Sequence, residues 1–374
     1  MKKTKARKQA PVNKNQSVTK KYEAIKLGLD WHACQYRVVR IIDGAGPEPA
    51  QRFSPEDFFK WVEKQLALAK KVYACYEAGA GGFVVYRRLT KLGATAYVVA
   101  PRKLDPRHKG VCNDATDARE LAQNLSLYVG GNPKAMQVVY VPTEEEEQRR
   151  AQSRQRQQLA KDRLSLASRG RCLLLSQGHR ESNHWWKPTR WAKLSPALPA
   201  WLVESLAITR RLILEVDKEL QSLTQKVSQA AAQTPRPVGL GALTLEALNR
   251  EVCSWKRFAN RKQPGSYAGL TGGVSASGNY QCDLSITKAG NARLRALLIE
   301  LAWRMVYYQP QCTLVQRWAT VMLNPKAHAR ARKKAIVAMA RRLFVDLWRW
   351  QTGRVTAEQL GWKMWEPAQA KAKA

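Results

Sequence analysis

The stretch YEAIKLGLDWH at residues 22–32 decides the fold of the first part of the chain. Its β-branched, aromatic and leucine residues predict a β-strand that ends near Asp30, and YRVVRIID at 36–43 predicts a second strand directly after it. Two further apolar runs, VYACYEAG at 72–79 and ATAYVVAP at 94–101, predict a third and a fourth strand. The chain therefore opens with sheet-forming sequence.

Helical patterns separate these strands. Ser54 predicts a helix N-cap, because apolar residues recur at helical spacing after it. GGFVVYRRLTKLG at 81–93 predicts a helix that ends on Gly93, and NDATDARELAQNLSLY at 113–128 predicts another. Strands mixed with crossover helices are typical of an α/β domain with a partly parallel sheet, and we assign this domain to residues 22–142.

Composition divides the rest of the chain. Residues 1–21 hold eight Lys and Arg residues before the first acid and predict a flexible basic arm. Residues 143–231 predict a helical hairpin or coiled coil. Its first helix, 143–178, starts acidic and turns basic, which favours the helix dipole. Residues 232–345 predict a mostly helical domain, whose turn PVGLG at 237–241 resembles a helix-hairpin-helix turn. Residues 346–374 are interpreted as a C-terminal extension.

The net charge is the strongest global signal. The chain has 64 Lys and Arg against 29 Asp and Glu, a net charge of +35. Such an excess repels itself in the compact state unless a polyanion neutralises it. Because it spreads over the whole chain rather than along one amphipathic stripe, it favours nucleic acid as the partner over an anionic membrane.

Cysteine, histidine and hydropathy patterns limit the class of protein further. The seven cysteines are scattered without a C-x-x-C pair, so neither a zinc site nor a disulfide framework is predicted. His32 and His108 lack the spacing of metal ligands and are interpreted as ordinary polar residues. No apolar run reaches the roughly 18 residues of a membrane span, and no signal-peptide core is present. These patterns predict a cytoplasmic, nucleoid-associated protein without membrane contact.

Four acids are predicted to meet at one site. Asp30 ends the first strand and Glu77 ends the third, at the carboxyl ends where α/β sheets place ligands. Asp114 and Asp117 share one face of a helix start, since they are three residues apart. Carboxylates so placed repel one another unless a cation lies between them. Mg²⁺ fits such a site, because it prefers hard oxygen ligands and leaves positions open for phosphate oxygens.

Taken singly, the four acids have simpler explanations. Asp114 could be only a helix N-cap, Asp117 a first-turn partner of the helix dipole, Asp30 a turn residue and Glu77 a surface acid. The set as a whole is harder to explain in this way. Acids are scarce in this chain, yet these four fall on adjacent predicted elements.

A Gly/Ser-rich segment in the second half predicts a second site. GSYAGLTGGVSASGNYQCD at 265–283 is predicted to be a loop, and SITKAGNARLRALL at 285–298 predicts a helix start. The glycines around Ser275 and Ser277 would expose a hydroxyl and let a phosphate approach the backbone. A merely flexible loop is the alternative, because a serine hydroxyl needs a base or a metal that the local sequence does not reveal.

A basic helical surface is predicted beyond this segment. Between Leu301 and Val345 there is no acidic residue, while Lys and Arg recur among apolar residues. Contact with phosphates is favoured over a solvated face. The cations predicted to contact nucleic acid, three of them beside the serine segment, are Lys288, Arg293, Arg295, Arg330, Arg332, Lys333 and Lys334.

Jointly these segments resemble a known family. GLDWH, YEAGAGG and NDATDARELA in the first half, and VGLGALT, YAGLTGGVSASG and ITKAGNARLRALLIELAW in the second, are similar to the DEDD transposases of the insertion-sequence one-ten family. These are relatives of the Piv-type DNA invertases and of bridge-RNA-guided recombinases. The resemblance covers roughly residues 22–345. It implies a RuvC-like, RNase H-like domain that binds Mg²⁺, followed by a transposase domain with a nucleophilic serine.

The resemblance also implies roles for individual residues. The family's acidic and serine positions fall on Asp30, Glu77, Asp114, Asp117 and Ser277, with the four acids as the Mg²⁺ ligands. The family's serine precedes a glycine, and Gly278 follows here. The family often has a proline shortly before that serine, which Leu270–Thr271–Gly272–Gly273 lacks. This departure leaves Ser275 as an alternative.

The implied function is DNA transposition through a covalent phosphoserine intermediate. The implied partners are donor and target DNA, a structured non-coding guide RNA, and further copies of the chain in a homodimer or homotetramer that shares composite sites. Two alternatives remain open. One is a Mg²⁺-dependent Holliday-junction nuclease that uses the four acids and water; the other is a non-catalytic RNA- or DNA-binding protein. The sequence reveals neither the DNA target nor the RNA.

Overall fold

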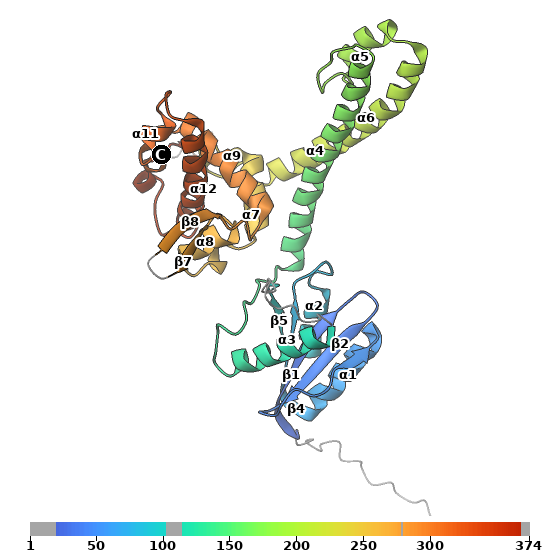
Figure 1. Ribbon diagram of the computed structural model, residues 1–374, viewed down its shortest axis with the longest axis vertical. Helices are drawn as coiled ribbons and strands as arrows, with labels where there is room; N and C mark the ends of the chain where they lie inside the picture. Colours follow the sequence, from blue (N-terminus) through green and yellow to red (C-terminus); the bar gives the residue numbers. More distant parts are fainter. Residues whose placement is uncertain (1–19, 102–113, 278–279, 368–374) are drawn as a thin grey trace, which may run out of the picture. The chain divides into compact units, whose positions relative to one another are not determined.

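The computed structural model describes residues 20–101, 114–277 and 280–367. The chain divides into two compact units, Met1–Val141 and Pro142–Ala374, each of which is described by itself (Figure 1). The first unit combines a mixed sheet with helices, and the second is mostly helical. The expectation of a mixed α/β protein with helix-rich second half is therefore confirmed.

A five-stranded sheet forms the centre of the first unit, in the order β3-β2-β1-β4-β5. Its strands are β1 (Tyr22–Trp31), β2 (Tyr36–Ile42), β3 (Gln51–Phe53), β4 (Ala69–Glu77) and β5 (Thr95–Val99). β1 pairs with β2 antiparallel and with β4 parallel, while β2–β3 is antiparallel and β4–β5 parallel. The partly parallel sheet is confirmed. The edge strand β3 was not predicted, because three residues are too few to show an alternating pattern.

Helices cover both faces of this sheet. They are α1 (Pro55–Leu68), α2 (Val84–Leu92) and α3 (Asp114–Val129). α1 and α2 share one apolar core with the buried residues of β1, such as Leu27. α3 packs on the other face, where Ala118 and Ala122 meet Val39 of β2 (Figure 1). Figure 1 shows α3 running across the strands on that side.

The capping residues predicted from sequence lie where they were expected. The Ser54 hydroxyl accepts a hydrogen bond of 3.2 Å from the Asp57 backbone N–H at the start of α1. α2 ends on Gly93, whose φ of 102° is left-handed and therefore favours glycine. Both helix boundaries follow from local chemistry.

Gly28 in the middle of β1 sets how closely α3 approaches the sheet. A Cβ at this position would lie 2.2 Å from the Ala122 backbone nitrogen and 2.3 Å from the Ala118 carbonyl oxygen. Both neighbours are backbone atoms of a helix, so neither can move without moving α3. The helix therefore rests directly on the β1 backbone.

We expect Gly28→Ala to push α3 off the sheet and to destabilise the first unit by about 3 kcal/mol, the upper range for overpacking. Amide hydrogen exchange of β1 and α3 in the full chain measures this loss. Gly44→Ala is the matched control, because a Cβ there meets no atom within 4 Å. Equal protection in the two variants would contradict the prediction.

A long helical hairpin opens the second unit. Its arms are α4 (Glu144–Ser176) and α6 (Ala200–Gln229), which pack side by side. Thr143 and Glu146 form a capping box at the start of α4, and acids fill the first turn. The two helices lie within the segment 143–231, in the same compact unit as the helices that follow.

The Pro- and Trp-rich segment 179–201 closes the far end of the hairpin. It contains α5 (Pro188–Leu194) and the short 3-10 helix Ser195–Ala197. Trp185 is fully buried and donates an indole hydrogen bond of 2.9 Å to the Ala167 carbonyl. A Cβ at Gly170 would lie 2.1 Å from the Trp185 ring, so this glycine makes room for it. The tryptophans in this segment therefore include a core residue of the hairpin tip.

Buried ion pairs join the hairpin to the helical part of the same unit. Arg154 on α4 makes two hydrogen bonds, of 2.8 and 2.9 Å, to the buried carboxylate of Glu251. Arg149 and Arg250 both reach Glu246, at 2.7 and 2.8 Å. Bidentate and shared pairs of this kind hold α4 in one register against α7, because a buried carboxylate without its cation is strongly destabilising.

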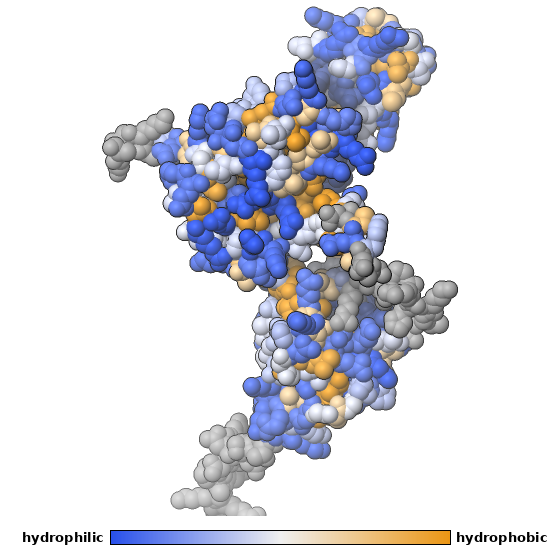
Figure 2. All heavy atoms as spheres, turned by 60° about the vertical axis from the view of Figure 1, so that its left-hand side comes forward, coloured by the Kyte–Doolittle hydropathy of each residue, from blue (hydrophilic) through white to orange (hydrophobic). Residues whose placement is uncertain are grey.

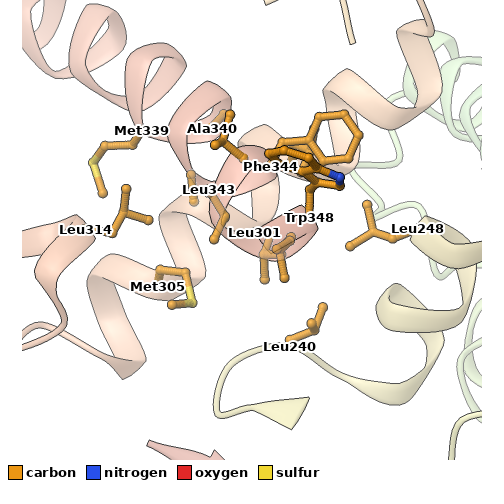
Figure 3. Packing of buried hydrophobic residues seen from close by; sticks show 14 of the residues in the cluster. Leu240, Leu248, Leu301, Met305, Leu314, Met339, Ala340, Leu343, Phe344 and Trp348 are labelled. Carbon is orange, nitrogen blue, oxygen red and sulfur yellow. The ribbon is translucent and has the colours of Figure 1, made fainter. Parts of the chain in front are cut away.

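The helical part has one apolar core built mainly from three long helices. The elements are α7 (Ala242–Val252), α8 (Lys262–Tyr267), α9 (Ala292–Tyr308), α10 (Thr313–Gln316), α11 (Ala319–Met322), α12 (Ala329–Gln351), the 3-10 helices Trp255–Arg257 and Glu358–Leu360, and the strand pair β6 (Arg236–Pro237) and β9 (Met364–Trp365). Figure 3 shows Phe344 and Trp348 of α12 in one cluster with Leu301 of α9 and Leu248 of α7. α12 continues to Gln351, past residue 345.

The Gly/Ser-rich segment differs from its prediction. Instead of a loop it forms an antiparallel pair, β7 (Gly272–Ser277) and β8 (Tyr280–Ile286). The following helix, α9, begins only at Ala292, because the Asn291 side chain caps it by accepting from the backbone N–H groups of Arg293 and Leu294. The helix start predicted within residues 285–298 thus lies at Ala292.

The described helices contain none that is both long and apolar enough to cross a bilayer. On the face drawn in Figure 2, hydrophilic residues predominate and the hydrophobic ones form small separate areas. Large contiguous apolar surface is thus absent from that view of the described residues.

Candidate active site

The carboxyl ends of β1 and β4 carry the first two predicted acids. Asp30 is the penultimate residue of β1 and Glu77 is the last residue of β4. Because the two strands are parallel neighbours, both acids lie at the same edge of the sheet. They line one pocket of about 510 Å³, together with Trp31, His32 and residues 78–81.

α3 brings the other two acids to this edge. Asp114 is its first residue, and the ligand atoms of Asp30, His32 and Asp114 all lie within 4.8 Å of one another. Asp117 follows three residues later, on the same side of the helix. Glu77 and Asp117 lie outside the tightest group, which Asp30 and Asp114 form with the histidine.

The acids crowd one another electrostatically. Burial raises the pKa of Asp30 above its ordinary value, and the charges of Asp114 and Asp117 raise it further, against the opposing effects of His32 and Arg37. Burial also raises the pKa of Asp117, with Glu120 and Asp114 adding to the rise. A bound cation would relieve this repulsion, so the residues form a possible divalent-metal site.

The interpretation of His32 as an ordinary polar residue needs correction. Its Nε2 lies 3.7 Å from the Asp30 carboxylate, and it belongs to the only group of potential ligands found among the described residues. It lies just past the end of β1, so strand spacing alone did not connect it with Asp114. His108, interpreted in the same way, lies outside the described residues.

A cation that the sequence did not single out lies among these acids. Arg37 of β2 is the cross-strand partner of Asp30, and its Nε lies 3.6 Å from the Asp114 carboxylate. That Nε is buried and has no hydrogen-bond partner in the described part of the chain. The guanidinium thus partly balances the acids. The antiparallel register of β1 and β2, which sequence periodicity does not specify, places it there.

Aromatic packing fixes the loop that follows Glu77. The Trp31 ring stands edge-on to Tyr36 and Tyr76, with ring centroids 6.0 and 6.2 Å away. A Cβ at Gly81 would collide with the Trp31 ring at 1.3 Å. The glycine-rich turn after β4 therefore lies against Trp31, next to Asp30.

Ser277 is the last residue of β7, where its backbone pairs with Tyr280 of β8. Ser275, the alternative nucleophile, lies two residues earlier opposite Cys282. Val274, Tyr280 and Leu284 are exposed on this hairpin. Both candidate serines thus lie on a β-hairpin, in the unit that does not contain the acids.

Tight backbone turns hold the base of this hairpin. Gly269 and Gly290 both have positive φ, and a Cβ at Gly290 would lie 2.5 Å from the Tyr267 carbonyl oxygen. Lys288 also has a positive φ, of 55°, which is uncommon for a residue with a side chain. Asn291 donates to the buried Glu251 carboxylate at 2.7 Å. The sequence KAGN therefore builds a turn between β8 and α9.

The predicted nucleic-acid-binding cations have different surroundings. Arg295 donates hydrogen bonds to the carbonyls of Ala268 and Lys288, so it also braces the turn. Arg293 donates to Gln157 of α4. Arg330, Lys333 and Lys334 are exposed near the start of α12, whose first turn has no acid. Cations at a helix N-terminus are electrostatically unfavourable, and a bound anion would offset that cost.

Comparison with known proteins identifies the family of this chain. Residues 237–315, which include the serine hairpin, match the model of the transposase family IS116/IS110/IS902. A putative transposase of Sinorhizobium fredii is 31% identical over 308 residues, covering 75% of this chain and 77% of that protein. This chain belongs to the IS116/IS110/IS902 transposase family.

Two further relatives have lower identity. Another putative transposase of Sinorhizobium fredii is 28% identical over 66% of this chain and 62% of its own length. The transposase of insertion sequence element IS1111A from Coxiella burnetii is 25% identical over 73% of this chain and 75% of its own length. The chain is thus a transposase, an enzyme of a mobile element that acts on DNA.

Replacing Asp30 tests the crowding of the acids. Folding raises the pKa of Asp30 above its unfolded value of about 4. Ionising this carboxyl therefore costs more in the folded state, so the free energy of unfolding falls as pH rises from the unfolded pKa through the folded pKa. We therefore expect Asp30→Asn to stabilise the metal-free first unit at pH 7 by about 1 kcal/mol, with a smaller gain near pH 4.

Hydrogen exchange of β1 and α3 with a chelator present measures this gain in the full transposase. Glu63→Gln, which removes an exposed acid of α1, serves as the control and should change little. Adding divalent metal should stabilise the parent chain but not Asp30→Asn. Destabilisation by Asp30→Asn without metal would contradict the crowding argument.

Proposed function

We propose that this transposase is a Mg²⁺-dependent DNA recombinase that cuts and rejoins DNA through a phosphoserine intermediate on Ser277. The observation that carries the proposal is that the ligand atoms of Asp30, His32 and Asp114 lie within 4.8 Å of one another. Glu77 lines the same pocket as Asp30, and Asp117 follows Asp114 by three residues on α3. The serine is assigned by its match to the family's motif, and Ser275 stays the alternative.

The topology of the first unit supports an RNase H-like, RuvC-like assignment. Its strand order is β3-β2-β1-β4-β5, with an antiparallel half followed by a parallel half. The acids lie at the end of the central strand β1, at the end of its parallel neighbour β4 and at the start of a helix packed on β1. This is the arrangement expected of a DEDD carboxylate site.

The donor set fits a hard divalent cation. Carboxylate oxygens of Asp30, Glu77, Asp114 and Asp117 are the ligands that Mg²⁺ prefers. The His32 imidazole is a ligand of transition metals rather than of Mg²⁺. When bound, such a cation would stabilise charge on phosphate oxygens during displacement. The chain's own part is to hold the carboxylates in place, through α3 packed on β1 and through Arg37 beside Asp114.

The serine chemistry we propose is a phosphoryl exchange. The Ser277 oxygen forms a bond to the phosphorus of a DNA phosphodiester, and the bond from that phosphorus to the leaving deoxyribose oxygen breaks. The serine proton passes to a base or to solvent, and the leaving oxygen gains a proton. Attack by a hydroxyl of another strand reverses the step and rejoins DNA. Lys288 and Arg293 would stabilise the developing negative charge.

Partners beyond DNA follow from the family resemblance. We propose a structured non-coding guide RNA and a homodimer or homotetramer in which acids and serine of different copies complete one site. The net charge of +35 supports binding to more than one polyanion, because each provides phosphates that Lys and Arg can neutralise. The charge alone does not distinguish RNA from DNA.

Substituting the serine tests the intermediate. We expect Ser277→Ala to abolish the covalent protein–DNA adduct, seen as a shifted band on a denaturing gel with labelled DNA. It should leave metal-induced stabilisation of the first unit intact, because the acids are untouched. Ser275→Ala is the matched control, and it should keep the adduct.

Other outcomes identify the alternatives. Loss of the adduct only in Ser275→Ala would move the nucleophile to Ser275. DNA cleavage that survives both substitutions would favour a nuclease that uses water and the four acids. Unchanged activity after Asp30→Ala and Glu77→Ala would favour a non-catalytic binding protein.

The charge predicts how binding responds to salt. If roughly six or more phosphates are contacted, affinity for DNA should fall about 10³-fold or more between 50 and 200 mM salt. Fluorescence anisotropy with a labelled duplex measures this slope. Replacing Lys333 and Lys334 by Gln should reduce the slope of log affinity against log salt concentration by about two, because both side chains are exposed at the start of α12. A flat response would contradict phosphate contact.

A further inference from the structure

The C-terminal half of α9 presents aromatic side chains to solvent. Trp303 is 43% exposed and Tyr307 is 78% exposed. They are four residues apart, so they lie next to each other on one face of the helix. The neighbouring Tyr308 is also exposed, and its ring stands edge-on to Tyr307 with centroids 4.8 Å apart. None of these residues belongs to the acid site or to the serine hairpin.

A further exposed aromatic residue lies on the strand pair whose turn contacts α9. β6 pairs with β9, so that Arg236 faces Trp365, and the guanidinium lies 3.7 Å from the centroid of that ring. Trp365 is 38% exposed. The turn after β6 joins the strand pair to α9, because a Cβ at Gly239 would lie 3.2 Å from Tyr308.

Arginine side chains are interleaved with these rings. Arg304 donates a hydrogen bond of 2.6 Å to the Gly239 carbonyl, and its guanidinium lies 5.4 Å from the Tyr308 ring centroid. Arg236 is held over Trp365. We call the resulting area the α9 aromatic surface. It consists of Trp303, Arg304, Tyr307, Tyr308, Arg236 and Trp365.

We propose that the α9 aromatic surface binds single-stranded DNA by stacking on unpaired bases. Exposed rings beside fixed guanidinium groups match the two chemistries of such a strand, the flat faces of its bases and its phosphates. A duplex hides its base faces and offers mainly phosphates.

DNA is the occupant that the chain's family membership supports, because a transposase acts on DNA. Cutting and rejoining strands leaves bases without a partner while strands exchange, so a site for unpaired bases has a use in the same reaction. The inference goes beyond the proposed serine chemistry and does not depend on Ser277 or on the metal. Its failure would leave that chemistry untouched.

Binding measurements on the full chain test the proposal. The probes are a fluorescein-labelled 12-nucleotide oligo(dT) and a blunt 12-base-pair duplex, followed by anisotropy without divalent metal. We expect Trp303→Ala and Tyr307→Ala each to weaken oligo(dT) binding about tenfold, within the range for loss of one stacked base. Duplex binding should change less than twofold. Trp303→Phe should retain most of the affinity, because it keeps an aromatic face.

A matched control separates stacking from general effects. Trp201 of α6 is 51% exposed in the same unit, and Trp201→Ala should leave oligo(dT) binding unchanged. Circular dichroism checks that each variant is folded; any misfolded alanine variant is replaced by Tyr307→Ser or Trp303→Gln. Equal loss of duplex and oligo(dT) binding would overturn the proposal.

Two other occupants would show themselves in the same experiments. If Trp303→Ala changes the sedimentation of the DNA-free protein from one oligomeric state to another, the surface is an interface between copies. If a 12-nucleotide oligo(U) RNA loses affinity in that variant while oligo(dT) does not, the surface binds RNA. Either result overturns the assignment to single-stranded DNA.

Discussion

The approach of α3 to β1 across Gly28 is the contact on which the acid site depends. α3 begins with Asp114, and its distance from Asp30 is set where the backbone of the helix meets the backbone of the strand. A side chain at position 28 would widen that distance by its own thickness. Carboxylates that share one cation must lie within a few ångströms of each other. Gly28 therefore determines whether Asp30 and Asp114 are close enough to share one. Burial raises the pKa of Asp30, and the charges of Asp114 and Asp117, which this contact brings near, raise it further.

Predictions from sequence succeeded where local patterns carry the information. The four strands β1, β2, β4 and β5 and the caps Ser54 and Gly93 follow from local sequence patterns. The places of Asp30 and Glu77 at strand ends follow from chain direction. His32 and Arg37 were missed because their positions depend on pairing. Arg37 faces Asp30 only because the β1–β2 turn fixes one antiparallel register, and a slip of one residue would turn it away. The hydrophobic periodicity of either strand does not specify how the two strands pair.

For the Gly/Ser-rich segment that carries the candidate serines, the prediction from sequence failed. Its glycines and serines suggest a loop, yet residues 272–286 form two strands. The apolar residues of the pair, Val274 and Leu284, are exposed, so the hairpin has no buried face to produce a clear inside–outside pattern. Its form is determined by the turns at its base, where Gly269 and Gly290 allow backbones to touch. These turns pack against α8, and such tertiary contacts cannot be predicted from the sequence of the segment alone.

Glu251 links the hairpin helix to the base of the serine hairpin. Burial raises the pKa of its carboxyl, but hydrogen bonds from Arg154 and Asn291 outweigh this effect and hold the pKa below its ordinary value. Arg154 belongs to α4, and Asn291 caps α9 directly after the turn that follows β8. A shift of α4 along its axis would therefore break either the ion pair or the cap, and both cost free energy because the carboxylate is buried. Glu251 thus connects the turn that supports the candidate serine to the long helical hairpin through hydrogen bonds from Asn291 and Arg154.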